Sequence, residues 1–172
     1  METVPPCSAP MLAVASHPSP LGTLVLSARD GALVGLHLPG SSDPAPEESD
    51  TAPVLDEARR QLDAYFAGER TAFELPLALA GTAFQQAVWN ALRKIPYGET
   101  CRYGALAAAV GNPAASRAVG MANHRNPIAI IVPCHRVNGA SGKLTGFGGG
   151  LPAKRYLLGL EQRHSVQPLG LR

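Results

Sequence analysis

Apolar and polar positions alternate in the first part of the chain in a way that predicts a hairpin followed by a helix. Residues 24–29 and 32–38 have the pattern of two strands, and the Asp-Gly pair at 30–31 is typical of a tight turn between them. Across residues 54–66 the apolar side chains recur at helical spacing, and Gly68 suits the C-cap. These elements predict an α+β fold for the first half.

Two irregular segments flank this helix. Residues 39–52 combine Pro, Gly, Ser and acidic residues and predict a flexible loop. Residues 73–77 predict a short strand, which Pro76 would confine to a sheet edge because proline has no N–H to donate. No group of side chains in residues 1–80 suggests chemistry, so we interpret this part as a support domain.

The second half of the chain has a helical pattern. A helix is predicted over residues 82–94, where the Thr-x-x-Gln spacing at 82–85 forms a capping box. Two short helices are predicted over residues 103–110 and 113–120, and a final helix over residues 152–161.

The two short helices have the pattern of a helix-turn-helix, joined at Gly111 and with Asn112 and Pro113 opening the second helix. In that motif the second helix enters a DNA groove. Here it carries small residues and one long side chain, Arg117, which suits a narrow groove and the space left by a displaced base. A tightly packed helical hairpin with Arg117 at the surface fits the pattern equally well.

The strongest candidate for chemistry is a thiol that follows an apolar run. Residues 128–132 predict a buried strand ended by Pro133, so Cys134 is expected to emerge where the strand leaves the core. A free cysteine is often an inert core residue. The neighbours His135 and Arg136 instead favour a lowered thiol pKa and a reactive thiolate.

His135 is the candidate base for this thiol. Neighbours on an extended chain point to opposite faces, so a direct hydrogen bond between Cys134 and His135 is not expected. A water between them would restore proton transfer, with Glu161 holding the imidazole tautomer. No further titratable group is placed to release a product from the sulfur, a pattern compatible with permanent modification of the cysteine.

Charge is divided unevenly along the chain. Residues 1–80 contain four arginines against eleven acidic residues, a net charge of −7. Residues 81–172 contain eleven basic residues against two acidic ones, a net charge of +9. This asymmetry predicts a polyanionic partner for the second half, with nucleic acid as the leading candidate. An electrostatic fit between the two halves is the alternative.

Cysteine usage and hydropathy narrow the class of protein. Three cysteines without a C-x-x-C pair argue against a disulfide framework and a cysteine zinc site, and predict a reducing, cytoplasmic location. Neither a membrane-spanning apolar run nor a secretory signal is found in the sequence, so neither insertion nor export is expected. The glycines at 146–150 lack the strand-GxGxxG-helix pattern, so no dinucleotide cofactor is expected.

One motif has a specific resemblance. Pro133-Cys134-His135-Arg136-Val137, preceded by Asn126-Pro127 and by Arg117-Ala118-Val119-Gly120, resembles the O6-alkylguanine-DNA alkyltransferases. The resemblance covers residues 81–163, with weaker likeness at Ser19-Pro20-Leu21-Gly22 and Tyr65-Phe66-Ala67-Gly68.

The resemblance implies a two-domain α+β fold: a small ribonuclease H-like α/β support domain at residues 1–80, and a mainly helical domain with a helix-turn-helix at residues 81–172. It also implies a single-turnover repair protein that binds double-stranded DNA through the minor groove and flips out the damaged guanine. The O6-alkyl group would pass irreversibly to Cys134, and O4-alkylthymine would be a poorer substrate. The protein would be a monomer without a cofactor, and cooperative assembly on DNA is left open.

The resemblance further implies roles for single residues. Cys134 would accept the alkyl group, His135 would be the water-relayed base, Glu161 its partner, and Asn126 a hinge residue bracing the site.

Other residues would serve DNA and the base. Arg117 would replace the flipped base, and Tyr103 would press on a phosphate and donate to the base. Further DNA contacts are expected from Asn112, Ala115, Ser116 and Arg125, and the substrate pocket is expected to include Val137, Phe147, Gly148 and Met121. Phe147 stands where many relatives have Tyr, and Gly148 where Ser is frequent, which leaves the substrate range open. The zinc ligands of some relatives have no match, so no metal is expected.

Two other functions are compatible with parts of the sequence. A lesion-binding protein that only flags damage would fit the DNA-binding half, although proteins of that kind lack the cysteine. A cysteine hydrolase is disfavoured by the adjacent Cys134 and His135.

Overall fold

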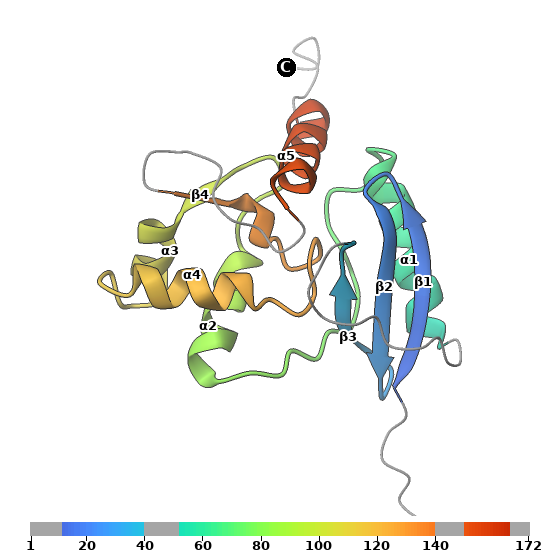
Figure 1. The fold of residues 1–172 in the computed structure, drawn as a ribbon, viewed down its shortest axis with the longest axis horizontal. Coiled ribbons are helices and arrows are strands. Elements are labelled where there is room, and N and C mark those ends of the chain that lie inside the picture. Colours follow the sequence, from blue (N-terminus) through green and yellow to red (C-terminus); the bar gives the residue numbers. More distant parts are fainter. Residues whose placement is uncertain (1–11, 40–51, 140–149, 166–172) are drawn as a thin grey trace, which may run out of the picture.

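The computed structural model describes residues 12–39, 52–139 and 150–165. A three-stranded sheet and one helix come first, followed by a mainly helical part (Figure 1). In chain order the elements are β1 (Ala13–Ser19), β2 (Gly22–Arg29), β3 (Ala32–His37), α1 (Pro53–Phe66), α2 (Ala83–Leu92), β4 (Cys101–Arg102), α3 (Tyr103–Ala109), α4 (Ser116–His124), the 3-10 turn η1 (Cys134–Arg136), β5 (Val137–Asn138) and α5 (Leu151–Ser165).

The predicted hairpin is confirmed as β2 and β3. Asp30 and Gly31 have φ values of 53° and 76°, the left-handed conformation that a tight hairpin turn requires. The sheet is antiparallel with the order β1-β2-β3. Strand β1 was not predicted, because its sequence of small residues with His17 and Pro18 lacks clear alternation. Its edge position tolerates that proline.

Helix α1 covers the sheet and confirms the predicted helical spacing. Leu55, Ala58, Leu62 and Tyr65 are buried on one side of it, and the helix contacts all three strands. Gly68 follows its end with φ 79°, as expected of a helix terminator.

The predicted strand at residues 73–77 is wrong. Only Leu77 forms a bridge there, to Leu33 of β3, with Leu33 N–H donating to Pro76 O at 2.8 Å. The pairing ends after this single bridge, since Pro76 has no N–H to donate and the chain continues toward α2.

The predicted strand at residues 128–132 is also wrong. Ile128 bridges Leu36 of β3, and the chain then turns, with Val132 N–H donating to Ile128 O at 3.0 Å. Ile130 has φ 71°, an uncommon conformation for a β-branched residue. The apolar run reflects a buried turn, because the side chains at 128 and 130–132 are all inside the core.

The helices of the second half occur where they were predicted, but their first and last residues differ from the predicted ones. The capping box of α2 is present, with Gln85 N–H donating to Thr82 Oγ1 at 3.1 Å, and α2 ends at Leu92, two residues before the predicted end. Helix α4 starts at Ser116, not at residue 113, because Asn112 O accepts from Ala115 N–H and closes a separate turn. It continues to His124, four residues beyond the predicted end.

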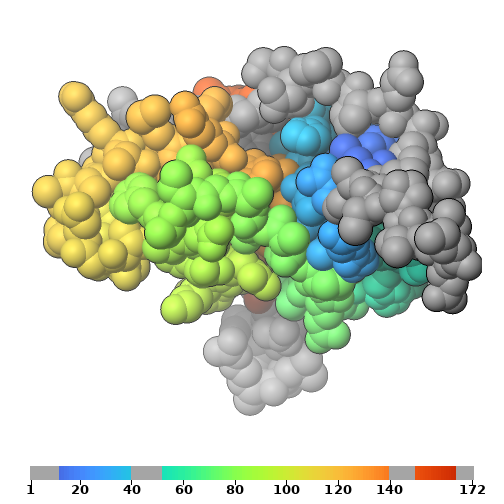
Figure 2. Space-filling model, turned by 90° about the horizontal axis from the view of Figure 1, so that it is seen from below, coloured from blue at the N-terminus to red at the C-terminus, as the bar shows by residue number. Residues whose placement is uncertain are grey.

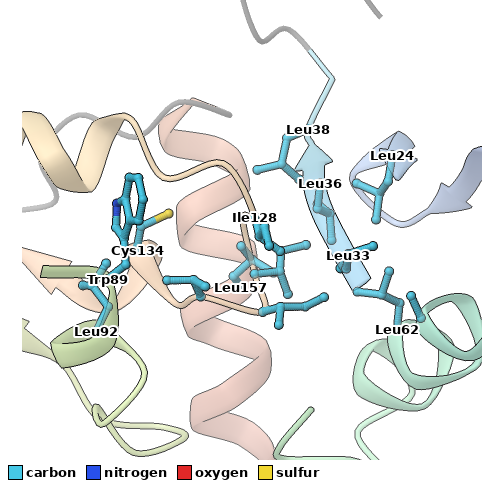
Figure 3. Close-up of a cluster of buried hydrophobic side chains, with 14 of the residues drawn as sticks. Leu24, Leu33, Leu36, Leu38, Leu62, Trp89, Leu92, Ile128, Cys134 and Leu157 are labelled. Atoms are coloured by element: carbon cyan, nitrogen blue, oxygen red, sulfur yellow. The ribbon is translucent and has the colours of Figure 1, made fainter. Parts of the chain in front are cut away.

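One continuous apolar core joins the sheet side to the helical side. Leu24, Leu36 and Leu62 lie at one end, and Trp89 and Cys134 belong to the same cluster at the other (Figure 3). Helix α5 stands between the two sides in Figure 1. Within the described ranges, no helix combines the length and apolar character needed to cross a membrane.

Candidate active site

The turn that carries Cys134 is held by one side chain, Asn126. Its Nδ2 donates to Val132 O at 2.7 Å, and its Oδ1 accepts from Ile128 N–H at 3.0 Å. Cys134 N–H donates back to Val132 O at 2.8 Å. These bonds hold the backbone on both sides of the turn and fix its position before the thiol.

Two expectations about Cys134 itself are wrong. The residue is only 6% exposed and is part of the core cluster, so it does not emerge from the core. Burial raises the pKa of its thiol to about 11, against an opposing effect of Asn126. The expected lowering fails because the basic side chains of His135 and Arg136 turn toward Glu161. The thiol is therefore protonated at neutral pH and needs a base.

Glu161 of α5 is the centre of a buried hydrogen-bond network. His135 Nε2 lies 2.7 Å from its Oε2, and Arg136 donates through Nε to Oε1 at 2.7 Å and through a terminal nitrogen to Oε2 at 3.0 Å. Tyr65 of α1 donates its hydroxyl to the same Oε2 at 2.6 Å. Both His135 and Glu161 are fully buried. The predicted pairing of His135 with Glu161 is thus present in the structure.

The charge states of this network follow from its contacts. Burial acts to raise the pKa of Glu161, but the hydrogen bonds from His135 and Arg136 outweigh it and hold the pKa at about 2. Burial lowers the pKa of His135, so its neutral form dominates at neutral pH. A carboxylate facing Nε2 assigns the proton to that nitrogen. Nδ1 is then the basic nitrogen, and it is buried without a hydrogen-bond partner among the described residues.

His135 and Cys134 belong to η1, a 3-10 turn, so the extended chain assumed for them is wrong. The separation inferred from it nevertheless holds, because no hydrogen bond joins the thiol to the imidazole within the described part of the chain. The imidazole donates to Glu161 through Nε2, so Nδ1 is the nitrogen that is left to accept a proton from the Cys134 thiol.

Two buried residues close to Cys134 were missed from sequence. Asn123 of α4 donates through Nδ2 to Cys134 O at 3.4 Å and contacts the Tyr103 hydroxyl at 3.5 Å, and its Oδ1 is buried without a partner among the described residues. Lys154 of α5 is fully buried and donates to Val137 O at 2.5 Å. Burial lowers the pKa of Lys154, and its charge acts in turn to lower the pKa of Cys134. A lysine at helical spacing from the buried residues Leu157 and Glu161 was the available signal.

The expected DNA-binding residues lie mostly on one surface. Ser116 and Arg117 are exposed on α4, Asn112 is exposed on the connection before it and Arg125 directly after it, and Ala115 is half-buried. This connection lies at the end of the molecule away from the sheet, and α2 lies between that end and the sheet (Figure 2). Arg117 is the second residue of α4 and extends from its first turn.

The expected pocket residues are not all brought together. Val137 is fully buried beside the thiol turn. Met121 is 59% exposed and lines a hollow between α2 and α4 with Phe84 and Arg125. Asn123, two residues further along α4, faces Cys134 instead, because positions two apart on a helix point to different sides. Phe147 and Gly148 lie outside the described residues.

Comparisons with known proteins identify the family and agree with the fold. The profile of the 6-O-methylguanine DNA methyltransferase DNA binding domain matches residues 83–163, and that of its ribonuclease-like domain matches residues 13–79. The methylated-DNA–protein-cysteine methyltransferase of Mycolicibacterium paratuberculosis is 53% identical over 158 residues, covering 89% of this chain and 94% of the relative. This chain belongs to the 6-O-methylguanine DNA methyltransferase family. The family's Mycobacterium leprae protein is 52% identical and covers 94% of this chain and 99% of the relative.

Solved structures of the family agree with the fold. The Mycobacterium tuberculosis O6-methylguanine methyltransferase superposes with a TM-score of 0.83 at 48% identity, covering 94% of this chain and 99% of the other. The Mycobacterium tuberculosis OGT in complex with DNA superposes with a TM-score of 0.81 at 50% identity, covering 93% and 96%. The predicted α+β class, with its ribonuclease-like and DNA-binding parts, is confirmed.

Proposed function

We propose that this protein repairs alkylated double-stranded DNA by moving the alkyl group from guanine O6 onto Sγ of Cys134, once per molecule. The observation that carries this proposal is the arrangement around His135. Its Nε2 is held by Glu161 at 2.7 Å, while its buried Nδ1 has no protein partner within the described ranges and can accept a proton from the neighbouring thiol side. Family membership supports the same reaction.

The chemical step balances with residues of this chain and one water. The thiol proton passes through the water to His135 Nδ1, the sulfur bonds to the alkyl carbon, and the bond between that carbon and O6 breaks. The buried charge of Lys154 stabilises the thiolate as it forms. The electron pair of the broken bond goes to the guanine, which takes a proton from Tyr103, a contact of Asn123. Solvent then returns a proton to Tyr103 and removes the one held by His135. The product is a thioether, which no group of the described site is placed to cleave, so the protein is consumed stoichiometrically.

Burial of the thiol requires the base to leave the duplex. A cysteine that is 6% exposed cannot reach O6 inside a base stack, so the lesion must be extruded, which costs a few kcal/mol. We assign Arg117, exposed at the start of α4, to the space left by the base after α4 enters the minor groove. Asn112, Ala115, Ser116 and Arg125 lie on or beside the same helix and would contact the backbone.

The proposal extends to the setting of the reaction. The chain binds DNA as a monomer, because the site is assembled from one copy. A free thiol used as a reagent also fits a reducing compartment, which supports a cytoplasmic location.

The test is a mass measurement. Incubation with duplex DNA that carries O6-methylguanine is expected to add about 14 Da, the replacement of a thiol hydrogen by methyl. The gain is lost in Cys134→Ala and retained in Cys101→Ala, the matched control for a half-buried thiol. No mass gain in the unmodified protein would refute the transfer. Lesion binding without a mass gain would instead support a protein that only flags damage.

A further inference from the structure

The network around Glu161 includes a residue from the N-terminal part of the chain. Tyr65, on α1, donates its hydroxyl to Glu161 Oε2 at 2.6 Å across 96 positions of sequence. His135 Nε2 lies 2.7 Å from that same oxygen. Tyr65, His135 and Glu161 are all fully buried. The first half of the chain, expected to supply no chemistry, therefore contacts the acid partner of the proposed base.

We propose that Tyr65 is a positioning residue for alkyl transfer, orienting the Glu161 carboxylate toward His135 and setting the strength of their hydrogen bond. This inference rests on the proposed function, in which His135 takes the thiol proton. The Tyr65 hydroxyl acts through Glu161, since its hydrogen bond goes to that carboxylate and not to the Cys134 thiol or the His135 imidazole.

The shared carboxylate explains how the Tyr65 hydroxyl affects the basicity of His135. A carboxylate offers about four good acceptor sites, and Glu161 is approached by donors from Tyr65, His135, Arg136 and the Gly98 N–H. Tyr65 and His135 share Oε2 with one nitrogen of Arg136, so the phenol withdraws electron density from the acceptor of the imidazole hydrogen bond. Removing the phenol makes this oxygen more basic, which favours the imidazolium form of His135.

Other charged and titratable groups surround the pair, and the substitution of Tyr65 by Phe changes none of them chemically. They are Arg136 and Cys134 on the thiol turn, Lys154 on α5, and Tyr97 on the segment before β4. A change seen on removing the Tyr65 hydroxyl can therefore be assigned to that hydroxyl.

Tyr97 is a matched control. Its ring packs edge-on against the Tyr65 ring at 6.2 Å and lies under the Arg136 guanidinium at 5.7 Å. Its hydroxyl is buried without a hydrogen-bond partner among the residues described. Tyr65→Phe and Tyr97→Phe thus each remove one buried hydroxyl from neighbouring rings, and only the first removes a contact with Glu161.

The experiment measures single-turnover methyl transfer from duplex O6-methylguanine DNA to the full-length protein across a pH series. We expect Tyr65→Phe to slow transfer by on the order of 10-fold at pH 7, or about 1.4 kcal/mol. The acidic limb of the pH-rate profile of Tyr65→Phe should move to higher pH, by about half a unit or more, because His135 then holds its proton more tightly. Tyr97→Phe should keep the unmodified protein's rate and pH profile.

Two outcomes separate the claims. A Tyr65→Phe profile that superimposes in pH on that of the unmodified protein would overturn the positioning role, whatever its rate. Failure of the unmodified protein to take up methyl would overturn the proposed function instead. If Tyr65→Phe does not fold, 3-fluorotyrosine at position 65 carries the test. Its more acidic phenol donates a stronger hydrogen bond, so the acidic limb should move to lower pH, and an unmoved limb would overturn the role.

Discussion

Replacing Glu161 by glutamine should lower the stability of the whole protein, because this carboxylate is the counter-charge of a buried cation. Arg136 is 7% exposed and directs two nitrogens at Glu161. Glutamine keeps the shape but removes the charge, and its NH₂ group faces donors from Arg136, His135 or Tyr65. Breaking one partner of a buried ion pair typically costs about 3–5 kcal/mol, since the remaining charge is left uncompensated.

The pKa of Glu161 gives an independent magnitude. It lies at about 2 in the folded protein against an ordinary value of 4.5. A depressed carboxylate pKa contributes stability that is fully present above the unfolded value and is lost as pH falls through the folded value. The difference corresponds to about 3 kcal/mol, lost between about pH 4.5 and pH 2. The free energy obtained from the lowered pKa of Glu161 therefore agrees with the typical cost of breaking a buried ion pair.

Thermal and denaturant unfolding test this reasoning. For a chain of this size, a loss of about 3–5 kcal/mol lowers Tm by roughly 6–20 °C. The acid-dependent part of the stability curve should also be much smaller in Glu161→Gln. Glu57→Gln is the matched control: hydrogen bonds from Arg60 and Gln61 lower the pKa of Glu57 to about 2 as well, but this carboxylate lies at the surface. Exposed pairs contribute little, so Tm should not change measurably. Equal shifts in the two variants would refute the reasoning.

Three further results are expected. Methyl transfer should keep its full rate as pH falls through 6.5 and decline only at lower pH, because burial lowers the pKa of His135 and the base must be neutral; a decline centred above 6.5 in a pH-rate profile would contradict this. Arg117→Ala should slow repair of duplex DNA far more than reaction with free O6-benzylguanine, measured side by side, and equal losses would exclude a role in replacing the base. Asn126→Ala should lower the free energy of unfolding by about 2 kcal/mol, one for each of two lost hydrogen bonds, and an unchanged denaturation midpoint would show that the thiol turn holds without it.

Local sequence signals predicted the local structure well. The Asp30-Gly31 turn, the spacing of α1 and the Thr82 capping box each depend on residues within a few positions of one another. The pairing of His135 with Glu161 was also predicted, because a cysteine, a histidine and a late glutamate fit the roles of nucleophile, base and orienting acid.

Features that depend on distant contacts were not predictable in this way. The run at 128–132 has the composition of a strand, but β3 pairs with it only at Ile128, and Ile130 turns the chain in a left-handed conformation. The burial of Cys134 comes from α2, α4 and α5 packing around that turn. Tyr65 looked like one more apolar position of α1, and only the tertiary fold brings its hydroxyl to Glu161.

The close packing of Cys134 has a consequence for the protein after repair. The thiol belongs to a continuous core that includes Trp89, and an added methyl group enlarges a side chain that is already enclosed. Overpacking a core typically costs about 1–3 kcal/mol, out of a total stability of about 5–15 kcal/mol. Under the proposed function, a molecule methylated at Cys134 is therefore expected to unfold more often than an unmethylated one, which would shorten its lifetime in a cell that degrades unfolded chains.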